Sequence, residues 1–520
     1  MILPLRRTLV FFIALSFLPA SSAGQQSGAA RAQGFRATER PVIYAHYMHC
    51  YILGTMTDGD LQQRQAPPDV AQDPDAWPLS ETIERSWWSA RLAPLAQSGK
   101  AGVAADFALA ETAGLDALAL LISTRHLPSS AYAAGMDLAA QVASDSKVKL
   151  IPDLWDLNLN ERVPPREELV KYGQGVKALM DRYPNAFFAH RGRPVISLGN
   201  AVRSERPFRW ADYRAVFEPW GGAQAVYIIL NLSWRADELP DDWGHAVDAF
   251  SRWAATQGWN DPQTHVLLQM SMRYRKPLAW PVSSSYYGGR QGTENIAESL
   301  GISRFTDQWR QAIASRTSFV VIQSWNDFSE DHAITETNYR GTSLIEINRY
   351  FADWYHGGIP PKIVQDAIYL FHHRQLVGAQ LTDATIYAVN DNWHATPTTD
   401  YLDVLTMLTQ PGKIRLRSGR HEWTLDAPAG VHEWLVYVPS GRFTLRSIER
   451  HIFRSGGSYP VSSAERAVTP VEEISAGFAE ATLLRDDQPI ASVRSRVPIA
   501  ARGRWQDLSL IGSVGRSMRK

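Results

Sequence analysis

The chain has 520 residues, a length that suggests two domains, and its 53 basic and 53 acidic residues leave no formal net charge. This balance argues against nucleic acid or an anionic membrane surface as the main partner, because both select basic proteins. The single cysteine, Cys50, excludes an intrachain disulfide, so the fold must be stabilised by burial alone. The 18 tryptophans are compatible with a protein that stacks aromatic rings on sugars, although most of them are expected in the core.

The first residues have the three parts of a secretory signal peptide. Arg6 and Arg7 form a short basic region, residues 9–18 an apolar region, and residues 21–23 a small-residue cleavage site. We expect residues 1–23 to be removed and residues 24–40 to form a flexible tail. The mature protein is then exported, to the periplasm or the medium, without membrane contact. A retained N-terminal anchor is the alternative.

Residues 41–360 alternate between apolar strand-like runs and helical patterns, which is typical of a parallel α/β fold. Eight ranges have the composition of buried strands: Val42–Met48, Ala117–Ser123, Val148–Trp155, Pro194–Gly199, Val226–Trp234, Val247–Trp253, Leu278–Ser283 and Phe319–Trp325. Helices are predicted at Ala104–Ala113, Ser130–Ser144, Arg166–Arg182, Trp210–Phe217, Thr264–Tyr274, Phe305–Ser315 and Leu344–Tyr355. Eight such repeats predict a (β/α)8 TIM-like barrel. A long insertion after the first strand, residues 49–103, is expected to shape a substrate cleft.

The pattern changes after residues 357–361, Gly-Gly-Ile-Pro-Pro, which predict the end of a helix and a linker. Short strand-like runs follow at near-regular spacing: Ala367–His372, Ala384–Val389, Leu402–Leu408, Lys413–Arg417, Glu433–Val438 and Arg442–Ile448. Residues 361–515 are therefore predicted to form an antiparallel β-sandwich accessory domain. The pair His372 and His373 is expected at its surface or at the linker, not as metal ligands.

The densest group of polar side chains follows the last predicted barrel strand. Trp325, Asn326, Asp327, Glu330 and His332 lie within eight residues, at the strand end where α/β barrels place their active sites. Two carboxyl groups at this spacing can act as general acid and general base across a glycosidic bond. Taken alone, the spacing also fits a helix-capping Asp and a solvated Glu.

The other predicted strands end in side chains suited to a saccharide, because amides and carboxylates bind sugar hydroxyls and rings stack on sugar faces. These residues are His46 and Tyr47 on the first strand, Asp153, Trp155 and Asp156 on the third, Asn231 and Trp234 on the fifth, and Tyr286 after the seventh. Trp325, Asn326 and His332, beside the two acids, are expected to bind substrate with them. For His46, Asp153 and the tryptophans, an ordinary position in the core is the alternative. Asp116 precedes its strand and is expected to be structural.

Other kinds of site have little support in the sequence. It contains no HExxH sequence and no cysteine cluster, so no metal site is predicted. No GxSxG, P-loop or GxGxxG sequence follows a predicted strand, which disfavours serine hydrolase and nucleotide-binding functions. The chemistry of paired carboxylates requires no cofactor. The sequence makes no prediction of the oligomeric state.

Four segments carry recognisable signatures in a fixed order. They are residues 45–48 (Ala-His-Tyr-Met), 113–120 (Ala-Gly-Leu-Asp-Ala-Leu-Ala-Leu), 192–197 (Gly-Arg-Pro-Val-Ile-Ser) and 325–334, which begins Trp-Asn-Asp. Over roughly residues 41–375 the chain resembles glycoside hydrolase family 71, the α-1,3-glucanases or mutanases. The resemblance implies a barrel followed by a β domain and endo-type hydrolysis of α-1,3-glucan with inversion. It places the family's paired acids on Asp327 and Glu330.

The chain departs from this family's pattern within the last signature. Phe328 and Ser329 stand where Tyr-Gly is usual, Asp331 replaces Ser, and Ala333 replaces Tyr. The added carboxylate of Asp331 is expected to disfavour the ionised form of Glu330, which suits a general acid. Two alternatives remain open: a hydrolase of another α-linked exopolysaccharide, and a polysaccharide-binding barrel without turnover. Retention of both carboxylates argues against the second.

Overall fold

The computed structural model describes thirteen stretches of the chain. They are residues 40–48, 99–123, 130–155, 164–199, 209–232, 239–253, 264–287, 296–327, 330–337, 339–381, 398–439, 466–503 and 508–518. The expected signal peptide, nearly all of the tail, most of the first insertion, Asp156, Trp234, and the predicted strands Ala384–Val389 and Arg442–Ile448 lie outside these residues.

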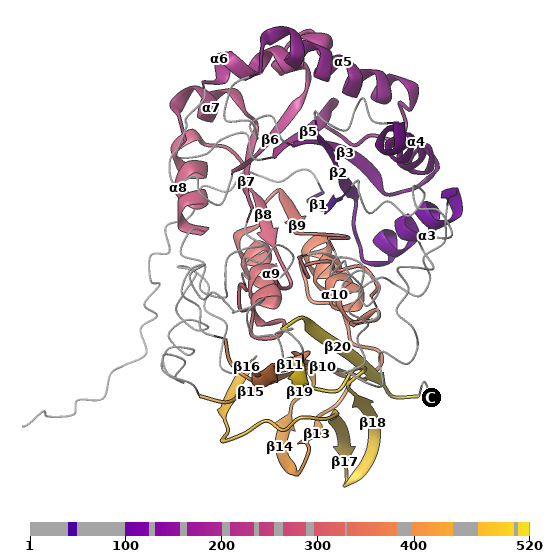
Figure 1. Cartoon of the computed structure of the whole chain (residues 1–520), viewed down its shortest axis with the longest axis vertical. Coiled ribbons are helices and arrows are strands. Elements are labelled where there is room, and N and C mark those ends of the chain that lie inside the picture. Colours follow the sequence, from indigo (N-terminus) through magenta and orange to yellow (C-terminus); the bar gives the residue numbers. More distant parts are fainter. Residues whose placement is uncertain are drawn as a thin grey trace, which may run out of the picture. The chain divides into compact units, whose positions relative to one another are not determined.

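Eight parallel strands form the first part of the protein (Figure 1). They are β1 (Val42–Tyr47), β2 (Ala117–Ser123), β3 (Lys149–Trp155), β5 (Arg193–Gly199), β6 (Tyr227–Leu232), β7 (Ala249–Arg252), β8 (Ala279–Val282) and β9 (Phe319–Ile322). Their order is β7-β6-β5-β3-β2-β1-β9-β8, and a parallel bridge from Phe250 to Leu278 joins the two ends. The predicted TIM-like barrel is confirmed, with all eight strands within the predicted ranges or one residue beyond them.

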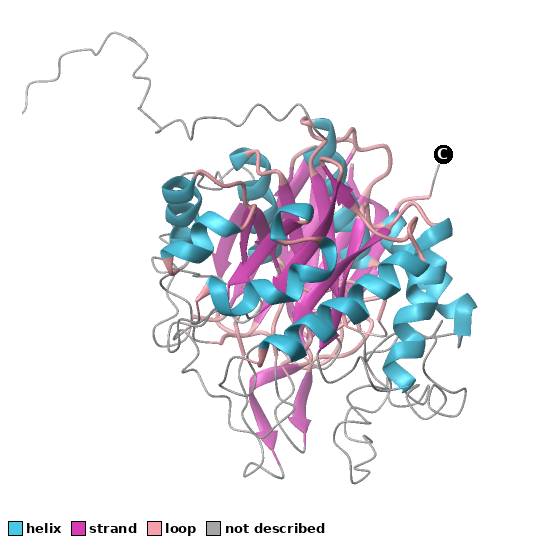
Figure 2. Ribbon diagram, turned by 90° about the horizontal axis from the view of Figure 1, so that it is seen from above, coloured by secondary structure: helices cyan, strands magenta, loops and turns pink. Residues whose placement is uncertain are grey.

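Helices surround the barrel strands, as the view from above shows (Figure 2). They are α3 (Gly99–Thr112), α4 (Ser130–Asp145), α5 (Arg166–Arg182), α6 (Trp210–Tyr213), α7 (Asp241–Ala246), α8 (Thr264–Tyr274), α9 (Ser303–Ser315) and α10 (Ser343–Gly357). After Tyr213 the chain tightens into a 3-10 helix (Arg214–Trp220) that contains Pro219, so the single helix predicted there is divided. Helix α7 and the short strand β4 (Ala189–His190) were not predicted, because they are too short to show a periodic pattern. Among the described residues, no helix is both long and apolar enough to cross a lipid bilayer.

The two faces of β1 have different surroundings, and this difference decides which side chains reach the site. Tyr44 belongs to the apolar cluster inside the barrel, and His46 follows it on the same face. Ala45 and Tyr47 belong to the larger cluster between strands and helices. Side chains two residues apart therefore share the interior, and their immediate neighbours do not.

Asp116 holds the start of β2 to β1. Its Oδ2 accepts the backbone N–H of Ile43 at 2.8 Å, and its Oδ1 pairs with Arg40 at 3.0 Å. The predicted structural role of Asp116 is confirmed.

The chain then forms two larger sheets with one core between them. The first contains β10 (Ala367–His373), β12 (Tyr401–Leu408), β15 (Gly430–Tyr437), β16 (Arg466–Pro470) and β20 (Leu510–Arg516), in the order β16-β15-β12-β10-β20. The second contains β13 (Gly412–Ser418), β14 (His421–Ala427), β17 (Ala479–Arg485) and β18 (Gln488–Arg494), in the order β14-β13-β17-β18. A further pair joins β11 (Gln375–Leu381) to β19 (Ala500–Gly503). The pairing is antiparallel as predicted, except that β15–β16 and β11–β19 are parallel.

His372 and His373 are buried within β10, so their expected position at a surface or linker is wrong. Burial is the main reason why the pKa of His372 falls to about 4. The ring is therefore neutral at physiological pH and behaves as part of the packed sheet.

The barrel and the sheets that follow it belong to one compact unit, Arg36–Lys520. Arg466 of β16 lies between Asp307 of α9, at 2.8 Å, and Glu433 of β15, at 2.8 Å. The backbone N–H of Ile302, just before α9, donates to Asp403 of β12 at 2.7 Å. Buried polar contacts thus cross from the last barrel repeats to the first sheet.

Candidate active site

The segment after β9 folds back on itself and brings three ionisable side chains together. Its turn is held by Ser324, whose Oγ accepts the backbone N–H of Asp327 at 2.8 Å. The N–H of Ser324 donates to the carbonyl of His332 at 3.0 Å, and the N–H of Ile334 donates to the carbonyl of Ser324 at 3.1 Å. These bonds place residues 327 and 332 beside each other at the carboxyl end of the barrel strand.

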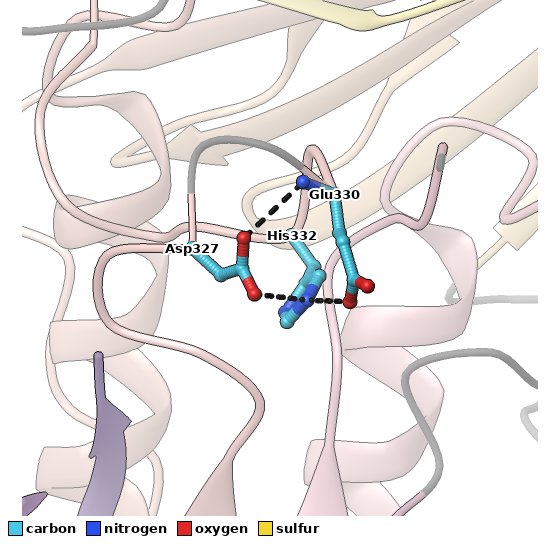
Figure 3. Close-up of side chains that lie close together, drawn as sticks. All are labelled: Asp327, Glu330 and His332. Atoms are coloured by element: carbon cyan, nitrogen blue, oxygen red, sulfur yellow. Dashed lines mark hydrogen bonds and ion pairs between the residues drawn. The ribbon is translucent and has the colours of Figure 1, made fainter. Parts of the chain in front are cut away.

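Asp327, Glu330 and His332 form a single cluster (Figure 3). The Nε2 of His332 lies 3.0 Å from Oε2 of Glu330 and 3.4 Å from Oδ2 of Asp327. The backbone N–H of Glu330 donates to Oδ1 of Asp327 at 3.2 Å. One oxygen of each carboxylate and the ring nitrogen all lie within 4.8 Å of one another. The two acids predicted from the sequence are therefore brought together, with an imidazole between them.

His332 carries a proton over most of the physiological pH range. Burial is the largest single influence and lowers its pKa, but the attraction and hydrogen bonds of Asp327 and Glu330 together outweigh burial and raise the pKa to about 9. The ring of Tyr286 stacks on the imidazole at a centroid distance of 6.0 Å. Burial, then the charges of Glu330 and Asp327, raise the pKa of Tyr286, so its hydroxyl stays protonated.

Two carboxylates and an imidazole are also ligand types that divalent cations accept. Here a cation would have to displace the proton of His332, which the two carboxylates hold up to a pH of about 9. The imidazolium offsets one of the two carboxylate charges.

A second polar group lies inside the barrel. Nδ1 of His46 lies 2.9 Å from Oδ2 of Asp153, and Nε2 of His46 lies 3.2 Å from Nδ2 of Asn231. With the Asn231 amide as donor, His46 carries its proton on Nδ1 and donates it to Asp153. Oδ1 of Asp153 and Oδ1 of Asn231 are buried without a hydrogen-bond partner among the described residues. Strands β3 and β6 thus each contribute one free acceptor, on a residue that contacts His46 of β1.

Aromatic rings connect these two polar groups. The ring of Trp253 lies 5.2 Å from His46, 5.5 Å from His332 and 5.6 Å from Trp155, measured between centroids. Trp155 also approaches His46 at 6.3 Å. The sequence-based choice of site residues missed Trp253. Its position directly after the sixth strand was the available signal, but that strand was the least clear of the eight.

Comparison with known proteins assigns the chain to a family. The sequence profile of glycosyl hydrolase family 71 matches residues 95–459, more than half of the chain. The chain belongs to glycosyl hydrolase family 71. A mutanase of Penicillium rubens is 25% identical over 239 residues, which are 40% of this chain and 50% of the relative. The chain therefore spans about half the length of this curated relative.

Solved structures similar to this family 71 chain are more distant. An endo-α-mannosidase of glycoside hydrolase family 99 from Bacteroides thetaiotaomicron aligns with 14% identity and a TM-score of 0.42, covering 61% of this chain and 97% of the other. A family 5 cellulase from an Icelandic hot spring isolate aligns with 13% identity and a TM-score of 0.35, covering 50% of this chain and 83% of the other.

Two residues predicted to bind substrate lie on the other side of the family 71 barrel wall. Tyr47 packs edge to face on Phe107 of α3 at a centroid distance of 6.1 Å, and Nε1 of Trp325 donates to Asp106 of α3 at 2.5 Å. Both rings are fully buried between strands and helix. Burial raises the pKa of Asp106 to about 6, partly offset by the hydrogen bond from Trp325. The structure therefore corrects the placement of Tyr47 and Trp325: they support the wall and do not line its interior.

Asn326 holds the loop in place. Its Oδ1 accepts the backbone N–H of Met48 at 2.7 Å, and its Nδ2 donates to the carbonyl of Met48 at 3.3 Å. The amide that was predicted to bind sugar hydroxyls thus joins the loop to the end of β1.

Asp331 does not act on Glu330 as the sequence suggested. Its backbone has a left-handed φ of 56°, and its carboxylate accepts Arg340 Nη2 at 2.9 Å and the backbone N–H of Leu510 at 2.8 Å. Because Arg340 compensates this charge, Asp331 no longer gives a reason to choose Glu330 as the acid.

Proposed function

We propose that this family 71 protein hydrolyses α-1,3-glucan, with Asp327 and Glu330 as its acid–base pair. The supporting observation is the convergence of both carboxylates on His332 at the carboxyl end of β9. The name of the Penicillium rubens relative, a mutanase, and the sequence resemblance favour an α-1,3 linkage.

The surroundings of the two acids favour different roles. The Asp327 side chain is 3% exposed, accepts a hydrogen bond from the Glu330 N–H and lies beside the positive charge of His332. Both contacts favour its ionised form. The Glu330 side chain is 36% exposed and can exchange protons with solvent. We assign Asp327 as general base and Glu330 as general acid, on this evidence in place of the argument from Asp331. In this role Glu330 takes up a proton, from solvent or from His332, before it donates one to the leaving group.

The stereochemical outcome depends on how far the acids stand apart. Inverting glycosidases hold their carboxyl groups roughly 6.5–9.5 Å apart to admit a water, and retaining ones roughly 5–5.5 Å. Here one oxygen of each lies within 4.8 Å, because both are drawn to His332. For the inversion implied by the family resemblance, we expect Glu330 to move away from His332 when glucan binds. Proton NMR of the first-formed anomer tests this: β-configured product supports inversion, and α-configured product contradicts it.

The second polar group and the rings are proposed to bind the sugar unit at the cleavage point. The free acceptors on Asp153 and Asn231 suit sugar hydroxyls, which are hydrogen-bond donors. Trp155, Trp253 and Tyr286 supply ring faces and edges beside them.

The first experiment is reducing-sugar release from insoluble α-1,3-glucan, with α-1,4-, α-1,6- and β-1,3-glucans alongside. Asp327→Asn and Glu330→Gln are each expected to lower kcat by at least about 100-fold, since general acid–base catalysis typically contributes that much or more. Glu336→Gln is the matched control, because this half-buried carboxyl lies in the same segment, outside the cluster. Loss of activity in the first two variants and not in the third supports the assignment.

Other results would select the alternatives. Release from a different α-glucan would indicate a hydrolase of another α-linked exopolysaccharide. Sedimentation with a glucan that is never cleaved would indicate a binding protein. Activity that survives both substitutions would contradict the assigned pair.

We also propose export of the mature protein and the domain bounds expected from the sequence: 1–23 signal, 24–40 tail, 41–360 barrel and 361–515 accessory domain. The signal-peptide pattern of residues 6–23 supports export. Secretion from an expressing host followed by N-terminal sequencing is expected to show a chain that begins near Gly24. A chain that keeps Arg6 and Arg7 would contradict cleavage.

A further inference from the structure

We infer that the C-terminal sheet is part of the catalytic apparatus: strand β20, together with Arg340, positions the acid–base cluster by holding Asp331. The inference rests on the proposed roles of Asp327 and Glu330. Asp331 and Arg340 then act as positioning residues, and the sheet serves to hold them in place.

Asp331 is the link between the sheet and the cluster. It stands in the chain between Glu330 and His332, and its side chain is 1% exposed. Oδ2 accepts the backbone N–H of Leu510, the first residue of β20, at 2.8 Å. A backbone donor on a paired strand cannot change its direction as a flexible side chain can. The contact therefore ties the site to the sheet.

Arg340 binds the other carboxylate oxygen and the main chain of Asp331. Its Nη2 donates to Oδ1 of Asp331 at 2.9 Å, and its Nη1 donates to the Asp331 carbonyl at 3.2 Å and to Oγ of Ser285 at 3.2 Å. Ser285 in turn donates its hydroxyl to the Asp331 carbonyl. Both the side chain and the main chain of Asp331 are thus held, which maintains its left-handed backbone conformation.

The neighbouring backbone is held in the same way. Tyr287 N–H donates to the carbonyl of Glu330 at 2.9 Å, and Ser324 N–H donates to the carbonyl of His332 at 3.0 Å. A displacement of Asp331 therefore acts on both residues whose side chains meet in the cluster. Misplacement by about 1 Å can cost about 100-fold in rate.

Strand β20 approaches the barrel at a second point. The N–H of Gly512 donates to the carbonyl of Tyr339 at 3.0 Å, one residue before Arg340. A Cβ at Gly512 would lie 2.7 Å from Phe371 and 2.7 Å from Ser343 Oγ, so this close approach requires glycine. Tyr339 and Ile511 also belong to one small apolar cluster. The contact at Asp331 is thus part of a continuous seam.

The decisive variant is Asp331→Asn, because asparagine keeps the size of the side chain and tolerates a left-handed backbone. Its amide offers one oxygen where the carboxylate offered two acceptors, so Arg340 and Leu510 N–H cannot both be satisfied. We expect kcat on the glucan to fall by about 10- to 100-fold, with KM changed less than about twofold.

Asp307→Asn is the matched control. It makes the same chemical change at another Arg-paired carboxylate of the same interface, bound by Arg466 at 2.8 Å. It is expected to lower the melting temperature and leave kcat unchanged below the transition. Arg340→Lys, which keeps the charge but not the fork of donors, is expected to lie between wild type and Asp331→Asn.

A second readout does not depend on hydrolysis. The His332 imidazole, assigned by comparison with His332→Gln, is followed by NMR titration, and its pKa near 9 reports contact with both carboxylates. Asp331→Asn is expected to lower that pKa, and Asp307→Asn is not. Unchanged kcat and unchanged His332 titration in Asp331→Asn and Arg340→Lys would overturn the inference. If the wild-type protein cleaves no glucan, but the pKa of His332 falls in Asp331→Asn and not in Asp307→Asn, the proposed function is rejected and the positioning role is retained.

Discussion

At the scale of single residues, the site is organised by one imidazolium that lies between two carboxylates. Asp327 and Glu330 would repel each other at this separation, and the positive charge of His332 reduces that repulsion. The sequence predicted both acids and included His332 among the substrate-binding residues. Only the fold shows that His332 stands between the acids, because the contact depends on the return of the chain from residue 330 to residue 334.

His332 should make the stability of the protein depend on pH in a specific direction. Its pKa in the folded protein is raised to about 9 from its ordinary value of 6.5, so its stabilising effect is complete below about 6.5 and disappears as the pH rises through 9. Relative to His332→Gln, wild type is expected to lose on the order of 3 kcal/mol of unfolding free energy across this interval. Urea unfolding at pH 6 and pH 9.5 measures the difference. Parallel losses in both proteins would contradict the pairing.

At the scale of elements, the alternation of side chains along a strand separated the predicted site residues inside the barrel from those outside it. The sequence placed His46 and Tyr47 together at the end of β1, but adjacent strand residues face opposite sides. His46 meets Asp153 inside the barrel, and Tyr47 meets Phe107 of α3 outside it. Which face of β1 becomes the interior is decided only when the eight strands close into a barrel. Trp253 was missed for a related reason, since β7 is a four-residue strand with a weak pattern.

The C-terminal strands show the same limit. Four of the six predicted runs coincide with β10, β12, β13 and β15, where apolar residues dominate the strand or, in β13, alternate with basic ones. Strand β20 contains two glycines and two serine or arginine positions, so its composition does not indicate a strand. Its pairing with β10 over seven residues makes it one, and this pairing brings the Leu510 N–H to Asp331.

At the scale of the whole molecule, the barrel and the first sheet are joined by charges buried between them. Arg466 is fully buried and contacts Asp307, Glu433 and Thr306. A guanidinium in such surroundings is stable only while its partners are in place. We therefore expect the barrel and the sheets to unfold in one cooperative transition.

Arg466→Met tests this coupling. Removal of the guanidinium leaves the buried carboxylate of Glu433 with the more distant Arg310, at 4.0 Å, in place of a direct partner. Loss of one partner of a buried ion pair typically costs about 3–5 kcal/mol of unfolding free energy. The control is Arg494→Met, which removes an exposed ion pair with Glu480 and is expected to have little effect. Chemical denaturation followed by tryptophan fluorescence measures both. Two separate transitions, of which only one shifts in Arg466→Met, would show that the two parts unfold independently.

The sequence by itself determined the barrel, its eight strands and the family, and it singled out the two carboxyl residues that we propose as the acid pair. These features depend on local patterns, namely apolar runs, short signatures and the residues at strand ends, which survive without knowledge of distant contacts. Only the tertiary structure decided the partner of each acid, the side of the wall on which Tyr47 and Trp325 lie, and the contact of β20 with Asp331. The residues of each such contact are far apart in the sequence or differ only in the direction they face. Neither property is recorded in a local pattern.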